Sequence, residues 1–199
     1  MGATPQPDRL RVLLIDRAPE RSEVVERALQ EQGHEVVGRG TSTLGLYDDV
    51  ERTQPDVIVI DTESPDRDTL EHICLLSERT PRPVVLFTDE RDDRVIRAAV
   101  RAGVTAYVVD GLAVERVVPI MQVAMARFAE FQSVKAERDA AHAKLSERKL
   151  VERAKGLLMS KRGMSEDDAY HALRRMAMER KLRMAEVAER VIGMSELLG

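Results

Sequence analysis

Five short apolar runs alternate with amphipathic helical patterns over the first 110 residues, and this alternation limits the possible folds most. The runs cover residues 11–16, 35–38, 55–61, 83–88 and 106–110. The third run, "PDVIVID", is continuous and rich in β-branched residues, as is typical of a strand buried on both faces. Strands that alternate with helices predict a parallel sheet covered by helices on both sides. A unit of about 120 residues matches the flavodoxin-like version of this α/β fold.

The helices of this unit are expected between the apolar runs, over residues 19–32, 43–53, 68–77 and 91–102. Gly103 follows the last of them and suits the left-handed residue that often ends a helix. We expect residues 1–10 to be a disordered N-terminus and residues 11–118 to form the α/β domain.

A long helix is predicted after the fifth strand. Residues 113–160 contain only Pro119 and Gly156 as helix breakers. Apolar residues recur there at steps of three and four, at Val117, Ile120, Ala124, Phe128, Phe131 and Val134. Two interpretations remain open: a seam that pairs with a second copy as a short coiled coil over residues 119–148, or a helix that packs only on its own α/β domain.

The last fifty residues, 149–199, have the pattern of a compact domain of three helices. Gly163 ends the first helix, and Ser165 followed by three acidic residues predicts the start of the second. Ala169, Tyr170, Leu173, Met176 and Ala177 form one face of that second helix, which places Tyr170 partly in the core. A third helix is expected over residues 184–192.

Positive charge gathers in this C-terminal domain. Residues 149–199 hold 11 Lys and Arg against 8 Asp and Glu, whereas residues 1–148 hold 20 against 27. A helical wheel places several cations beside the apolar stripe, with Gly156 leaving a bare backbone position among them. The predicted nucleic-acid contacts are Lys149, Arg153, Lys155, Gly156, Lys161, Arg162, Arg174 and Arg175. The alternatives are an ordinary solvated face and a surface that docks an acidic protein.

Composition excludes several other classes. A single cysteine, Cys74, allows no internal disulfide and fits a reducing cytoplasm. No apolar run approaches the length of a membrane span, so we expect a cytoplasmic protein with no membrane partner. No pairing of nucleophile and base and no cluster of metal ligands is evident, so we expect neither an enzyme nor a cofactor.

Four polar residues fall at the carboxyl ends of the expected strands, where ligands bind in open α/β sheets: Asp16, Asp61, Thr88 and Asp110. The segments that carry these residues are, in chain order, "LLID", "VIVID", "LFT" and "GVTAYVVD". Their order and spacing resemble those of the receiver domains of response regulators. The resemblance implies that Asp61 is at the position of the phosphoacceptor. It also implies that the family has a second acid beside Asp16, which binds a divalent ion, and a lysine at the position of Asp110, which contacts the phosphoryl group.

Here Arg17 stands in place of the second acid, and Asp110 stands in place of the lysine. Losing a carboxylate weakens a Mg²⁺ site at Asp16 and Asp61, and an aspartate repels a phosphoryl anion. We expect a degenerate phosphoacceptor site, with Arg17 paired to Asp61 or Asp110. A conventional switch driven by phosphorylation of Asp61 is the alternative.

The C-terminal stretch "KLVERAKGLLMSKRGMSEDDAYHALRRMAMERKLRMAEVAERVI" resembles an ANTAR domain over its whole length. The matching elements are Ala154-Lys155-Gly156, Ala169-Tyr170, Leu173-Arg174, Ala177-Met178 and Val187-Ala188. The resemblance implies a transcription antiterminator that binds paired stem-loops in nascent leader RNA as a homodimer. The whole chain is similar to the NasT-type regulators of nitrate and nitrite assimilation, which implies control by a nitrate/nitrite-sensing NasS-like partner.

Overall fold

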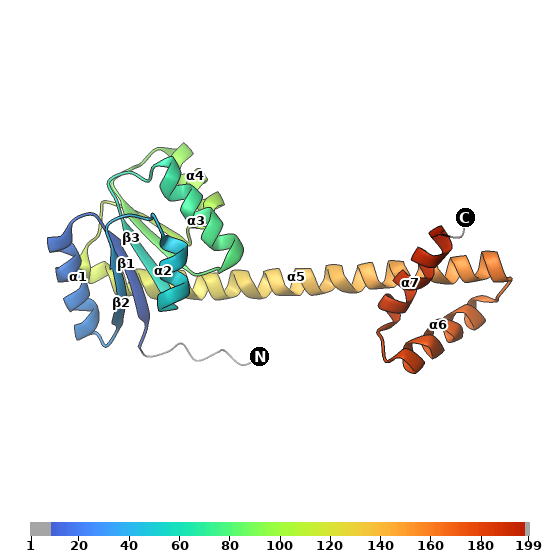
Figure 1. The fold of residues 1–199 in the computed structure, drawn as a ribbon. Helices are drawn as coiled ribbons and strands as arrows, with labels where there is room; N and C mark the ends of the chain where they lie inside the picture. The colour runs from blue at the N-terminus through green and yellow to red at the C-terminus, as the bar shows by residue number, and fades with distance from the viewer. Residues whose placement is uncertain (1–8, 198–199) are drawn as a thin grey trace. The chain divides into compact units, whose positions relative to one another are not determined.

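A five-stranded parallel sheet forms the centre of the first unit of the computed structural model, which describes residues 9–197 (Figure 1). Its strands are β1 (Arg11–Asp16), β2 (Glu35–Gly40), β3 (Val57–Asp61), β4 (Val84–Thr88) and β5 (Ala106–Val109). They lie in the order β2-β1-β3-β4-β5, and every neighbouring pair is parallel. This is the flavodoxin-like order, so the predicted fold class is confirmed.

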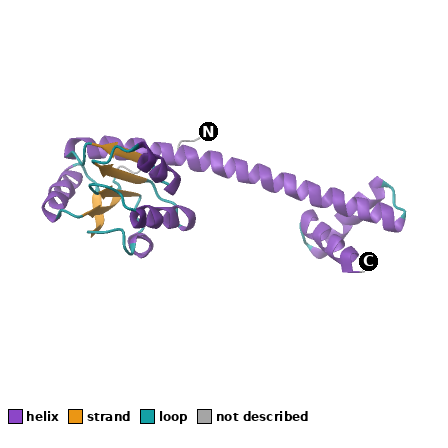
Figure 2. Ribbon diagram, turned by 90° about the horizontal axis from the view of Figure 1, so that it is seen from above, coloured by secondary structure: helices purple, strands orange, loops and turns teal. Residues whose placement is uncertain are grey.

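Alternate residues of each central strand feed two separate cores. Val12 and Leu14 of β1 face the core that is completed by α1 (Pro19–Glu31) and the first turns of α5 (Val114–Arg162). Leu13 and Ile15 face the core that is completed by α2 (Leu46–Thr53), α3 (Arg67–Arg79) and α4 (Asp93–Ala102). Strands with two buried faces read as continuous apolar runs, which is why "VIVID" identifies a central strand. Helices on both sides of the sheet are visible in Figure 2.

Local signals place most helix ends within a few residues. Gly103 follows α4 with a φ of 107°, in the left-handed region that favours glycine. Three starts differ from the predictions. Helix α2 begins at Leu46 and not at residue 43, because Gly45 precedes it with a left-handed φ of 80°. Capping side chains set the other two. Asp92 accepts a hydrogen bond from the Arg94 amide, which places the start of α4 at Asp93. Asp66 accepts one from the Thr69 amide at the start of α3.

Helix α5 belongs in part to each of two compact units, residues 1–131 and 132–199. Val117, Met121 and Ala124 are buried in the first unit's core, which therefore continues past the expected domain end at residue 118. The predicted disorder of residues 1–10 concerns mostly residues 1–8, which lie outside the described residues. Leu10 is buried in the same core.

The second unit packs α6 (Glu166–Arg180) and α7 (Met184–Leu197) on the end of α5. Its core is small and consists of Ala154, Leu158, Ala169, Leu173, Ala177, Val187, Ala188 and Ile192. Gly163 has a φ of 66° after α5, and Ser165 accepts a hydrogen bond from the Asp168 amide as the N-cap of α6, both as the sequence predicts. Helix α7 continues beyond the predicted end at residue 192.

Candidate functional site

Asp16 and Asp61 lie side by side at the carboxyl ends of β1 and β3, where they are register partners. Both are buried, with 1% and 4% of their surfaces exposed. The Ala18 amide donates to Asp16 Oδ1 at 2.8 Å. The cavity beside Asp61 has a volume of about 10 Å³, about the minimum for one water molecule. Little free volume therefore adjoins the Asp61 carboxylate.

Arg17 points to the start of α3 and pairs with neither Asp61 nor Asp110. Its Nη2 atom lies 3.6 Å from Asp66 Oδ2. Hydrogen bonds from Thr69 hold the pKa of Asp66 below its usual value, with a smaller contribution from the Arg17 charge. The predicted partners of Arg17 are wrong because Asp61 is buried and Asp110 pairs with Arg91. Asp66, the N-cap acid of α3, is accessible and within reach of Arg17.

Thr88 and Asp110 complete this end of the sheet. Thr88 is buried, donates to the Glu63 carbonyl at 2.8 Å and accepts from the Glu90 amide at 3.2 Å. Asp110 has a φ of 76° and forms an ion pair with Arg91, with 65% of its side chain exposed. Asp110, which stands where the family has a lysine, is thus paired with the Arg91 guanidinium.

The donor set at this site does not match the divalent-ion site that the receiver resemblance implies. Asp16 and Asp61 provide two carboxylates, and the third position holds the Arg17 guanidinium, which binds elsewhere. Over residues 9–197, no group of three His, Cys, Asp or Glu side chains is arranged to hold a metal ion.

Lys155 is buried, contrary to the exposed flank on which the helical wheel places it. Only 7% of the residue is exposed. Its Nζ atom donates to Glu166 Oε1 at 2.7 Å and to both carboxylate oxygens of Glu152 at 3.0 and 3.1 Å. These bonds, first with Glu166 and then with Glu152, raise the pKa of Lys155, and the Lys155 ammonium lowers the pKa of Glu166. The ion pair fastens the start of α6 to α5.

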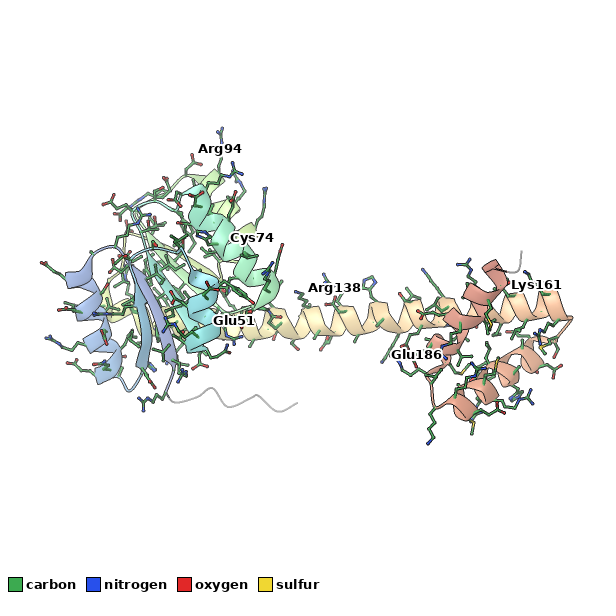
Figure 3. All side chains as sticks on the ribbon, in the orientation of Figure 1. Glu51, Cys74, Arg94, Arg138, Lys161 and Glu186 are labelled. Atoms are coloured by element: carbon green, nitrogen blue, oxygen red, sulfur yellow. The ribbon has the colours of Figure 1, made fainter. Side chains whose placement is uncertain are left out.

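The other predicted contact residues lie on the surface of the second unit, where side chains are drawn in Figure 3. Lys161, labelled there, donates to the Ser195 carbonyl at 3.2 Å. A Cβ atom added to Gly156 would meet no atom within 4 Å, so its bare backbone faces open space. The exposed cations of the predicted set are Lys149, Arg153, Lys161, Arg162, Arg174 and Arg175.

Tyr170 is more accessible than the sequence predicts, with 40% of its surface exposed. It packs edge-on against His171, with ring centroids 6.0 Å apart. Together with Lys144, Arg148 and Arg183 it lines a groove that no sequence pattern indicates. These residues are far apart in the chain, and only the packing of α6 and α7 on α5 brings them together.

Two family matches cover most of the chain. Residues 12–122 match the response regulator receiver domain, and residues 139–192 match the ANTAR domain. The transcriptional regulatory protein PdtaR of Mycobacterium tuberculosis is 34% identical over 183 residues, which cover 92% of this chain and 89% of that protein. The chain belongs to the ANTAR-domain response regulators.

Two further comparisons concern single domains of this ANTAR response regulator. The nitrate regulatory protein of Klebsiella oxytoca is 47% identical over 53 residues, 27% of this chain and 13% of that protein. The receiver domain of response regulator NarL from Mycobacterium tuberculosis superposes with a TM-score of 0.51 at 24% identity, over 59% of this chain and 98% of that one, which shows the fold alone. PdtaR, which aligns with most of this chain, is a transcriptional regulatory protein. Within residues 9–197, no helix combines the length and hydropathy that crossing a membrane requires.

The contact between Lys155 and Glu166 yields a prediction about stability. A double-mutant cycle with Lys155→Met and Glu166→Gln, measured by urea unfolding at pH 7, is expected to give a favourable coupling energy. Because the folded-state pKa of Glu166 lies below 4.5, this contribution is present above pH 4.5 and is lost as the pH falls through the lowered value. Because the pKa of Lys155 is raised above 10.5, the same contribution to stability is retained on the alkaline side up to pH 10.5.

The exposed pair Arg97–Asp93 on α4, with 3.6 Å between Nη1 and Oδ2, is the matched control. We expect the same cycle there to give only about 0.3–0.5 kcal/mol, as is usual for exposed helix pairs. Equal coupling energies at the two sites would contradict the structural role of Lys155.

Proposed function

We propose that this protein is a transcription antiterminator that binds paired stem-loops in nascent leader RNA through its ANTAR domain. The observation that carries the proposal is the ANTAR match over residues 139–192, on the part of the chain with excess positive charge. RNA loops expose phosphates and unstacked bases, which suit cationic side chains and a close approach of backbone.

The proposed RNA contacts are the predicted residues that the fold leaves on the surface. Arg174 and Arg175 extend from α6, away from its buried Leu173. Gly156 lowers helix stability by about 1 kcal/mol relative to alanine. No neighbouring atom of the chain would clash with a side chain at this position, so packing within the protein does not require a glycine here. A partner backbone that approaches Gly156 explains its presence. Lys155 instead positions α6, since its ammonium already binds two carboxylates.

Charge reversal on α6 tests RNA binding. The probe is an RNA selected by the wild-type chain from a pool with two adjacent hairpins and randomised loops. We expect the Arg174→Glu, Arg175→Glu double variant to lose binding in a gel shift, and wild-type affinity to fall steeply with salt.

The matched control is Arg94→Glu with Arg97→Glu, which makes the same charge change on the exposed surface of α4. It is expected to retain binding. Failure of the wild-type chain to enrich any RNA would overturn the proposed function, and equal losses in both double variants would place the contact elsewhere.

We propose further that a sensor protein, and not phosphorylation of Asp61, controls this antiterminator, and that its targets are nitrate and nitrite assimilation genes. Three features support this control: the arginine beside Asp16, the acid at position 110, and the confinement of Asp61. The similarity of the ANTAR region to a nitrate regulatory protein supports the target genes and a NasS-like partner.

Phosphoacceptor variants separate the two modes of control. Because Asp110 opposes a phosphoryl anion, titration of the wild-type chain with beryllofluoride and Mg²⁺ is expected to leave hydrogen exchange of β4, β5 and α4 unchanged. Asp61→Asn is expected to bind the selected RNA like wild type. A conformational change that beryllofluoride induces in wild type and not in Asp61→Asn would instead support the phosphorylation switch.

A homodimer on RNA is the third part of the proposal. Phe131, Val134 and Leu145 lie on α5 with 63%, 56% and 51% of their surfaces exposed. With Arg138 and Ala141 they recur at alternating steps of three and four, the spacing of a coiled-coil seam. The earlier seam positions Val117 and Ala124 are buried in the first unit's own core, so the proposed dimer contact begins at Phe131.

A charge in this seam is expected to weaken the dimer. Leu145→Glu should reduce the dimer fraction of the RNA-bound chain in sedimentation velocity, because it places a carboxylate where two seams meet. Ser133→Glu adds the same charge at an exposed position outside the seam and is expected to have no effect. A dimer that tolerates both changes equally would exclude this seam.

A further inference from the structure

An open groove crosses the second unit where α5, α6 and the start of α7 meet. Its volume is about 530 Å³. The lining comes from α5, from Tyr170 of α6, from Arg183 just before α7, and from the first two residues of α7, Met184 and Ala185. The residues of α5 are Lys144, Glu147, Arg148, Val151 and Glu152. The groove therefore exists only when all three helices are packed together.

The charges of the groove favour an anion. Its two carboxylates already have cationic partners, since Glu147 Oε1 lies 3.3 Å from Arg183 Nη1 and Glu152 Oε2 lies 3.0 Å from Lys155 Nζ. Lys144 and Arg148 are exposed, and neither forms an ion pair with a carboxylate in the described part of the chain. Two cations are thus available to an incoming polyanion.

Tyr170 adds an aromatic ring to this cationic groove. Its residue surface is 40% exposed, whereas the neighbouring Ala169 is fully buried. Val151, Met184 and Ala185 provide apolar surface beside it. An accessible aromatic ring next to apolar side chains and cations is the combination that holds an unstacked base together with its flanking phosphates. An acidic peptide would use the cations and would gain little from the ring.

We propose that this groove receives one unstacked loop base of the RNA, which stacks on Tyr170 while Lys144 and Arg148 contact the flanking phosphates. The inference rests on the proposed RNA-binding function and identifies a base-binding site within it. Arg183, held by Glu147, forms the far wall of the groove. None of the groove residues is among the predicted RNA contacts. Their substitution therefore tests the groove while the predicted cations remain in place.

Substitution of Tyr170 separates stacking from general attraction. With the selected two-hairpin RNA as probe, Tyr170→Ala is expected to weaken binding about 5- to 150-fold, the loss of one stacked base, with an unchanged dependence on salt. Tyr170→Phe retains the ring and should bind within about twofold of wild type. Met178→Ala removes a side chain of the same helix that is 72% exposed and lies outside the groove, and it should have no effect.

The cations of the groove are tested through the salt dependence. Arg148→Ala is expected to reduce the slope of log affinity against log salt by about 0.7, the value for one phosphate contact on a single strand. Arg190→Ala removes an exposed arginine of α7 outside the groove and should leave the slope unchanged. Thermal unfolding of each variant confirms that the second unit is folded.

The outcomes distinguish this inference from the proposed function. If wild type binds the RNA and Tyr170→Ala binds equally well, the groove is not a base site, although RNA binding stands. Equal losses in Tyr170→Phe and Tyr170→Ala would also overturn the stacking. If wild type binds no RNA and an acidic peptide occupies the groove instead, the proposed function fails together with the inference.

Discussion

The second unit depends on the packing of two short helices against the last turns of α5, around a core that contains four alanines from these three helices. Ala154, Ala169 and Ala177 allow the helix backbones to approach closely, and Leu173 fills the space between them. Lys155, next to Ala154, binds Glu166 at the start of α6. This combination of apolar packing and one buried cation fixes the start of α6, and with it the positions of Tyr170, Arg174 and Arg175. The proposed RNA surface is therefore a product of this small core.

The same small core explains what the sequence could and could not predict. Ser165 and Gly163 act through their own backbone neighbourhood, and the apolar runs reveal strands because both faces are buried. Those features are local, and they are predicted correctly. A helical wheel shows on which side of α5 the Lys155 side chain lies. It cannot show that Glu166 of another helix contacts Lys155 on that side. For Tyr170 the helical wheel errs in the other direction, because the neighbouring helices leave 40% of the residue surface exposed.

In the receiver unit, two residues carry the opposite charge from their counterparts in the family, and the fold accommodates both. Arg17 and Asp110 each replace a residue of opposite charge, and each finds a partner outside the central pair of carboxylates. Asp66 receives Arg17, and Arg91 receives Asp110. The sequence predicts that the charges are changed, but the partners depend on loop positions that no periodic pattern reports. The sheet itself is unaffected, since β1 and β3 keep Asp16 and Asp61 in register.

We propose that the ANTAR unit, and within it the groove beside Tyr170, contacts RNA. Ultraviolet crosslinking of the full chain to its selected two-hairpin RNA, followed by mass spectrometry of the peptides, tests this claim most directly. We expect crosslinks on peptides that contain Tyr170 and residues 144–153. Crosslinks confined to the receiver domain, residues 12–122, would contradict it.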